Sequence, residues 1–173
     1  MKRQQTKTTI VGIDPGTRVT GYGIILVEGG RQLSPIDYGC ISPPVKEPLS
    51  YRYKVIFEAI LSLLEKYQPD AMAVETQYIA KNPQSVMKLG MAKGMAVLAA
   101  SLRDIPVFEY APSRAKKSVV GSGRASKVQV QAMVGRLLRL PKPPHPEDAA
   151  DALALAICHG NTCQNKLEHL HRI

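Results

Sequence analysis

The chain has 173 residues, of which 45% are hydrophobic and 21% are charged, as is typical of a globular domain with its own core. No stretch approaches the roughly 20 apolar residues of a membrane-spanning helix, and no apolar segment of a signal peptide follows the basic N-terminus. Three cysteines are too few for a disulfide framework. Composition therefore argues against a membrane protein or a secreted disulfide scaffold and predicts a cytoplasmic protein.

The excess positive charge lies in one part of the chain. The formal net charge is +9, yet residues 8–109 hold equal numbers of basic and acidic side chains. Residues 110–146 hold eight basic residues and no acid. Such a segment favours a polyanion as partner, because clustered lysine and arginine attract a phosphate backbone. A solvated face that only keeps the protein soluble is the alternative.

Three strands are predicted at the start of the chain. Residues 8–14 are β-branched and apolar, and they end at an Asp-Pro-Gly turn, in which proline and glycine preset the backbone. Residues 19–27 and 31–42 predict two further strands that are joined by a Gly-Gly hairpin turn. Consecutive strands with tight turns form an antiparallel meander.

Helices and short strands alternate after the meander. Apolar periodicity predicts a helix over 49–67, a buried strand over 71–75 and a fifth strand over 105–110. Between these strands, the helix predicted over 83–102 is apolar on nearly every face. Its glycines, Gly90 and Gly94, permit close approach of another helix, so we expect it in the core or in a subunit interface.

The last third of the chain predicts two helices. Residues 126–140 form a cationic amphipathic pattern, and the basic segment before them is predicted only to turn at Gly121-Ser122-Gly123. After a proline-rich connector, the final helix begins with Pro146 at its first position, where proline is favoured. This helix is expected to fray after His159.

The element order predicts an α/β protein with a single domain over residues 8–160. Residues 1–7 are expected to be a disordered basic tail and residues 161–173 a C-terminal tail. The expected sheet is five-stranded and mixed, with three antiparallel strands followed by parallel strands, and helices flank it. The first strand and the strand over 71–75 are expected to be parallel neighbours.

Four carboxylates are predicted to meet at one cleft. Asp14 and Glu75 end the two strands that are expected to lie side by side. Asp148 and Asp151 share a face of the last helix in its first turn, where the helix dipole tolerates negative charge. Carboxylate oxygens suit hard cations such as Mg²⁺ or Mn²⁺. Two such ions would neutralise the acids and could promote phosphodiester hydrolysis.

Most of these acids also have a structural interpretation. Asp14 could form an Asx-type turn, Glu75 could be a surface acid, and Asp148 could complement the helix dipole. We interpret Glu147 as surface charge that the dipole favours. Asp151 is harder to explain in this way, because its neighbours are apolar and indicate a packed helix.

Segments in unbroken order over roughly residues 8–160 resemble the RuvC family of Holliday-junction resolvases. The matching segments are Gly12–Gly23, Val74–Glu75, Ala80–Asn82, Lys88–Gly90, Pro106–Ala111, Val119–Gly121 and Asp148–Ala154. The Asp-Pro-Gly turn alone is a weak signal, whereas all of the segments together and in order are specific.

The resemblance implies an RNase H-like fold, a homodimer, and Mg²⁺-dependent paired nicking of opposed strands at a four-way (Holliday) DNA junction. This activity belongs to homologous recombination and DNA repair. The metal-binding catalytic set that it implies agrees with the acids chosen above, namely Asp14, Glu75, Asp148 and Asp151. A branch-migration complex of the RuvA and RuvB type is the further partner that it implies.

Contacts to DNA are expected from aromatic and basic side chains. The resemblance implies that Tyr78 stacks on an unpaired base, although an ordinary loop tyrosine is the alternative. Lys116 and Lys127 match positions that the family uses against the DNA backbone. Further basic contacts are expected at Lys81, Arg114, Lys117 and Arg124.

Two other functions stay open at this point. An actin-like ATPase also ends its first strand in an Asp-x-Gly turn, but it needs two such domains and a longer chain. A non-catalytic junction-binding module would keep the basic segment, but it has no need of four convergent acids. A zinc site near the C-terminus is disfavoured, because its cysteines and histidines match no standard spacing.

Overall fold

A computed structural model describes residues 7–29, 32–76, 82–164 and 172–173. Within these ranges the strands form a five-stranded sheet in the order β3-β2-β1-β4-β5. The strands are β1 (Lys7–Asp14), β2 (Thr20–Glu28), β3 (Gln32–Ile41), β4 (Ala71–Glu75) and β5 (Val107–Tyr110). The first three strands pair antiparallel, whereas β4 is parallel to both β1 and β5. The predicted mixed sheet is confirmed.

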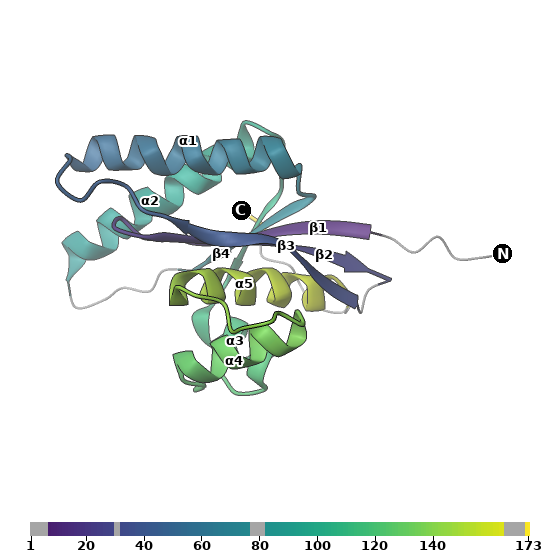
Figure 1. Cartoon of the computed structure of the whole chain (residues 1–173). Coiled ribbons are helices and arrows are strands. Elements are labelled where there is room, and N and C mark those ends of the chain that lie inside the picture. The colour runs from purple at the N-terminus through teal and green to yellow at the C-terminus, as the bar shows by residue number, and fades with distance from the viewer. Residues whose placement is uncertain (1–6, 30–31, 77–81, 165–171) are drawn as a thin grey trace.

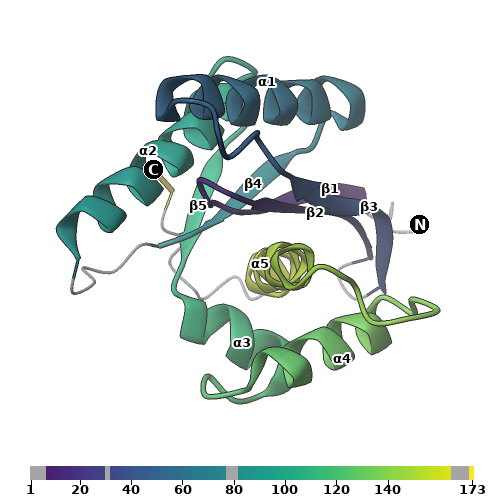
Figure 2. The same cartoon turned by 60° about the vertical axis from the view of Figure 1, so that its left-hand side comes forward.

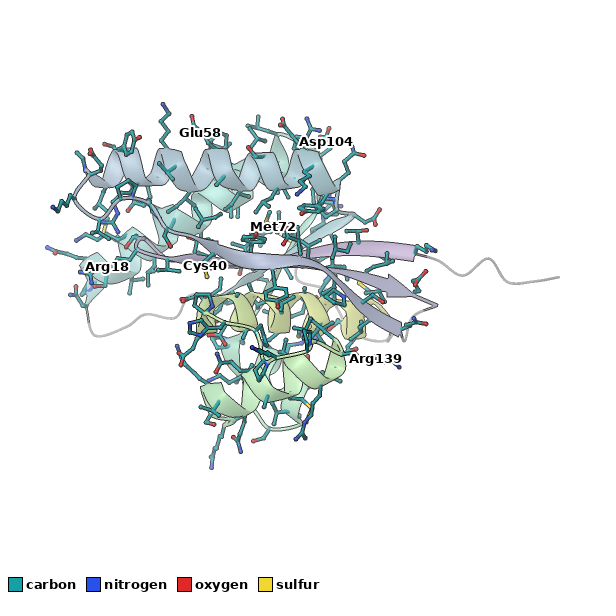
Figure 3. The ribbon with its side chains drawn as sticks, viewed as in Figure 1. Arg18, Cys40, Glu58, Met72, Asp104 and Arg139 are labelled. Carbon is teal, nitrogen blue, oxygen red and sulfur yellow. The ribbon has the colours of Figure 1, made fainter. Side chains whose placement is uncertain are left out.

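Helices cover both faces of the sheet (Figures 1 and 2). One face packs against α1 (Leu49–Tyr67) and α2 (Pro83–Ser101), and the other packs against α5 (Glu147–Gln164). The short helices α3 (Pro112–Val120) and α4 (Lys127–Leu137) lie on the outer side of α5. Because both faces are covered, β1 is apolar and buried from Ile10 to Ile13, and β4 from Ala71 to Val74. Figure 3 shows Met72 of β4 between the sheet and the α1–α2 layer.

The helix α5 lies unusually close to β1 and β2. A Cβ atom on Gly12 would lie 1.9 Å from the carbonyl oxygen of Ala152, and one on Gly21 would lie 2.0 Å from that of Asp148. Glycine is therefore required at both positions for the backbones to approach this closely. This contact sets the depth at which the first turn of α5 reaches the end of the sheet.

The basic segment contains a helix that the sequence analysis did not predict. α3 begins with Pro112 in its first turn and ends at Gly121, whose φ of 82° is the left-handed conformation of a helix C-cap. Only Ala115 and Val119 are buried on it. Two buried apolar residues in nine give too little periodicity to distinguish a helix from a loop.

The first strand and the last helix extend further than expected. Lys7, which we assigned to the tail, is the first residue of β1 and pairs with Glu28, with Nζ 2.7 Å from Oε1. The expectation that α5 frays after His159 is wrong, because this helix continues to Gln164. Buried His159 helps to hold this part of α5, since its ring stacks on Phe108 with centroids 4.5 Å apart.

The helix α2 is buried on one face only, although its pattern is apolar nearly all round. Its buried residues are alanines, whereas Met87, Met91 and Leu98 are exposed.

Across the described ranges, no helix is long and apolar enough to cross a membrane.

Candidate active site

Three of the four predicted acids line one cleft at an end of the sheet. Ile13 of β1 is paired with Val74 of β4 in parallel register, so Asp14 and Glu75 leave neighbouring strands side by side. Asp151 reaches the same edge because α5 lies directly against β1 and β2. Together these acids line a cavity of about 290 Å³.

The fourth acid, Asp148, borders the cleft and does not line it. Its backbone lies against Gly21 of β2, one helical turn before Asp151. Its charge still acts on the cleft, because it is one of the charges that raise the pKa of Asp14. The structure therefore brings three acids together directly and places the fourth next to them.

The acids of the cleft repel each other when they are ionised. Burial first, and then the charges of Glu75, Asp151 and Asp148, together raise the pKa of Asp14 to about 8. Burial is also the largest cause that raises the pKa of Glu75 and of Asp151. A divalent cation bound among them would lower these pKa values, because an opposite charge favours the ionised form.

The donor atoms of the cleft fit a hard divalent cation. They are carboxylate oxygens, which Mg²⁺ and Mn²⁺ prefer over nitrogen or sulfur. Within residues 7–29, 32–76, 82–164 and 172–173, no three His, Cys, Asp or Glu side chains already have the spacing of a closed metal site. Side-chain rotation would be needed for coordination, and a cation would offset the repulsion between ionised acids brought closer together.

Two of the predicted DNA-contact lysines enter the cleft. Lys116 of α3 and Lys127 of α4 line it, and their charges lower the pKa of both Glu75 and Asp151. The ammonium of Lys127 also lies 3.1 Å from Oε2 of Glu147. Glu147 is about half exposed in the first turn of α5, as its interpretation as surface charge predicts, and it also forms an ion pair with a cleft lysine.

The remaining predicted DNA contacts lie outside the cleft or outside the described residues. Arg114 and Lys117 are exposed on α3, and Arg124 is exposed between α3 and α4. The Arg114 guanidinium lies over the ring of Tyr110, 5.3 Å from its centroid. Tyr78 and Lys81 fall within 77–81, which the structure does not describe.

The sequence analysis missed two side chains that hold the turn after Asp14. The hydroxyl of Thr20 donates to the carbonyl of Gly16 at 2.7 Å and accepts from its N–H at 3.2 Å. Arg52 of α1 donates to the carbonyl of Thr17. A signal for Arg52 was available, because it lies four residues before Ile56 on the buried stripe of its helix, where a charged residue is unexpected.

Comparison with known proteins gives a consistent family match. Residues 10–159 match the sequence model described as crossover junction endodeoxyribonuclease RuvC. The protein of that name from Protochlamydia amoebophila is 61% identical over 150 residues, which cover 87% of this chain and 89% of the relative. The one from Chlamydia pneumoniae is 54% identical over 160 residues, with 91% and 95% covered.

Solved structures show the same fold. RuvC of T. thermophilus in complex with a Holliday junction substrate superposes with a TM-score of 0.89 at 30% identity, covering 96% of this chain and 99% of that one. The yeast mitochondrial Holliday junction resolvase Ydc2 superposes with a TM-score of 0.65 at 17% identity, covering 91% and 80%. At that identity the second likeness concerns the RNase H-like fold alone.

Proposed function

This chain belongs to the RuvC family of crossover junction endodeoxyribonucleases, and from that premise we propose that its acid cleft cuts DNA with divalent metal ions. The family makes the protein an endonuclease that resolves four-way DNA junctions in recombination and repair. It also leaves no basis for the actin-like ATPase alternative. One observation carries the metal-dependent mechanism, namely the convergence of Asp14, Glu75 and Asp151 on a single cleft.

We assign metal binding to the four acids, with two Mg²⁺ ions for each site and Mn²⁺ as a substitute. When bound, such ions activate the attacking water and stabilise the leaving oxygen. Asp14 takes the central role, since its ionisation is coupled to Glu75, Asp151 and Asp148. These acids come from β1, β4 and α5, so the packed core fixes their backbones relative to one another.

The cleft lysines stabilise charge on the phosphate that is cut. Lys116 and Lys127 approach the acids from α3 and α4, on the side of the cleft away from the sheet. An ammonium in this position forms charge-assisted hydrogen bonds to phosphate oxygens. Both lysines therefore connect the binding surface to the reacting group.

Exposed basic residues extend the DNA surface beyond the cleft. Arg114, Lys117 and Arg124 lie on α3 and on its connection to α4, where they would hold the phosphate backbone without reading sequence. For Lys81 we propose the same role, and for Tyr78 stacking on an unpaired base, from the family resemblance alone.

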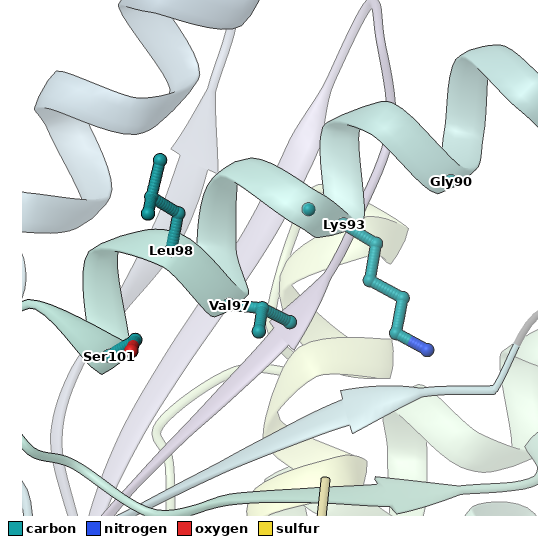
Figure 4. Close-up of a pocket in the computed structure, with 6 residues that line it drawn as sticks. Gly90, Lys93, Val97, Leu98 and Ser101 are labelled. Carbon is teal, nitrogen blue, oxygen red and sulfur yellow. The ribbon is translucent and has the colours of Figure 1, made fainter.

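We propose that α2 is the contact of a homodimer. Its exposed face is apolar, with Met87 69% exposed and Leu98 47% exposed. A Cβ on Gly94 would meet nothing within 4 Å, so the face is hollowed there. Figure 4 shows this hollow, which is lined by Gly90, Lys93, Gly94, Val97, Leu98 and Ser101. Two copies would supply one cleft for each of the two strands that are cut at a dyad-symmetric junction.

Two further proposals rest on the family. Residues 8–160 act as one nuclease domain, in agreement with the span of the family match, and Lys7 and the last turn of α5 to Gln164 extend its first strand and last helix. A branch-migration complex of the RuvA and RuvB type delivers the junction. Neither proposal is needed for the chemistry of the cleft.

The direct test is cleavage of a labelled synthetic four-way junction and of a linear duplex with the same sequences. With Mg²⁺ we expect paired, ligatable nicks in the junction only, and EDTA should abolish them. Tight junction binding without nicks in Mg²⁺ or Mn²⁺, across several core sequences, would instead support the non-catalytic binding module.

A further inference from the structure

Arg52 is a charged residue in the core beside the candidate active site. Its side chain is 9% exposed, in the first turn of α1 on the stripe that also holds Ile56 and Ile60. Burying a guanidinium is unfavourable unless it is paired and hydrogen-bonded. No salt bridge joins Arg52 to a carboxylate of the described residues, and its Nε has no hydrogen-bond partner among them. A feature this costly needs a reason beyond filling space.

The contact that Arg52 does make is with the turn that carries Asp14. Its Nη2 donates to the carbonyl oxygen of Thr17, in the connection between β1 and β2. The same connection is closed from within by the two hydrogen bonds between Thr20 and Gly16. Arg52 therefore links this turn to α1. The turn's own hydrogen bonds already limit its shape.

The turn is held from both sides of the sheet. On one side, α5 lies against Gly21, the residue paired with Asp14. On the other side, α1 reaches the turn through Arg52. Neighbouring Arg18 is exposed at the same end of the molecule (Figure 3).

We propose that Arg52 is a positioning residue, which fixes the turn after β1 and so sets the direction from which Asp14 enters the cleft. This inference rests on the proposed catalytic role of Asp14. A guanidinium suits the task, because its planar set of donors holds a carbonyl in one direction, whereas an ammonium holds it less firmly.

The first test measures the turn itself, without metal and without DNA. In Arg52→Met, amide hydrogen exchange over residues 16–21 should be faster by about tenfold or more, while the amides of α1 and of residues 10–13 stay protected. Arg52→Lys should lie between that variant and the wild type. The matched control is Lys54→Met, which removes an exposed cation from the same helix and should leave the turn unchanged.

The second test measures the consequence for cutting. With saturating protein, Arg52→Met should cut a four-way junction about 100-fold more slowly, because small misplacements of a reacting group have effects of this size. Junction affinity should stay within about threefold of the wild type, since the phosphate contacts lie elsewhere. Arg52→Lys should recover part of the rate, and Lys54→Met should cut normally.

Several outcomes would overturn the inference. Unchanged exchange of the turn in Arg52→Met would show that the residue does not hold it, and wild-type cutting would show that holding it is irrelevant. Equal losses of cutting and binding, with general loss of protection in α1, would make Arg52 a structural anchor only. A wild-type protein that cuts no junction would refute the proposed function instead, whatever the exchange experiment shows.

Discussion

Asp14 lies where burial and three neighbouring carboxylates act on one group, and its pKa rises from 3.8 to about 8. Because this folded-state pKa lies above the unfolded value, the protonated form stabilises the fold. That contribution is complete below the unfolded pKa and is lost as the pH rises through about 8. Asp14 therefore destabilises the metal-free protein, and this destabilisation increases with pH.

We expect Asp14→Asn to raise the melting temperature of the metal-free protein. The gap to the wild type should widen between about pH 4 and about pH 8. Over that range Asp14 loses its proton in the unfolded chain and keeps it in the folded protein, whereas asparagine does not titrate. Thermal unfolding in EDTA, followed by circular dichroism, measures this. Glu58→Gln, which neutralises an exposed acid on α1, is the control. A gap of equal size at every pH would contradict the electrostatic origin.

We expect Glu147 to compete with DNA for Lys127. Its carboxylate lies 3.1 Å from the ammonium, and both side chains are about half exposed. An exposed ion pair contributes about 0.2–1 kcal/mol, so a phosphate can replace it readily. We expect Glu147→Gln to tighten junction binding about two- to fivefold at low salt, with less effect at high salt.

A double-mutant cycle separates this contact from general electrostatics. In a Lys127→Met background, Glu147→Gln should have a clearly smaller effect on junction affinity, as measured by fluorescence anisotropy without divalent metal. An effect of the same size in both backgrounds would mean that Glu147 acts only through long-range charge.

The site residues that could be predicted are those fixed by local pattern. Asp14 and Glu75 each follow an apolar strand, and Asp151 lies in an alanine-rich helix, so their place at one sheet end follows from topology. The place of Arg52 on a buried stripe was a signal, but its contact with Thr17 and the pairing of Lys127 with Glu147 could not be predicted in this way. Each depends on how a side chain of one helix meets a segment distant in sequence.

At the scale of elements, α5 is placed by glycines of the sheet. Its buried face consists largely of alanine, including Ala149, Ala152 and Ala156. These small residues pack on Gly12 and Gly21, and the first turn of α5 thereby brings Asp151 to the ends of β1 and β4. The site thus depends on a close backbone contact as much as on its acids.

We expect Gly21→Ala to reduce cutting more than junction binding. The new Cβ would meet the backbone of Asp148, so the first turn of α5 must shift, at a cost of about 1–3 kcal/mol in folding stability. Single-turnover cleavage and urea unfolding measure the two effects. Gly160→Ala lies at the other end of α5, where the nearest atom is a side-chain methyl of Val27 at 3.1 Å. That control should keep its activity, and equal losses in both variants would contradict a local cause.

Two elements were predicted to the residue, namely a helix with several apolar turns and a short strand that is apolar up to its last residue. The helix over 49–67 and the strand over 71–75 have the bounds of α1 and β4. Other short elements were less certain, because α3 has only two buried apolar residues and β5 begins at Val107 and not at residue 105. Propensity and periodicity need several turns or several alternations before they distinguish structures.

At the scale of the whole molecule, α2 is the element whose role a single chain cannot decide. Its pattern allowed either the core or an interface, and the described fold buries only its alanine face. The exposed apolar residues opposite this alanine face are Met87, Met91 and Leu98, which helical spacing places on one side. A contiguous apolar surface of this kind is typical of a protein interaction site.

We expect the wild-type protein to be a dimer and Leu98→Lys to be a monomer, because a charge in an apolar interface is left unpaired. Light scattering coupled to size-exclusion chromatography measures the mass. Val128→Lys makes the same change at an exposed residue of α4, 71% accessible, and should stay dimeric. A monomeric wild type would show that α2 does not form a dimer contact. A dimeric Leu98→Lys variant would show that the contact lies elsewhere.

The most direct measurement of the central claim compares four variants, Asp14→Asn, Glu75→Gln, Asp148→Asn and Asp151→Asn, for junction cutting and junction binding in the same preparations. The account predicts that each variant loses about 100-fold or more in single-turnover cutting and binds within about threefold of the wild type. Near-normal cutting by any one of the four variants would contradict these roles, as would loss of binding in all four.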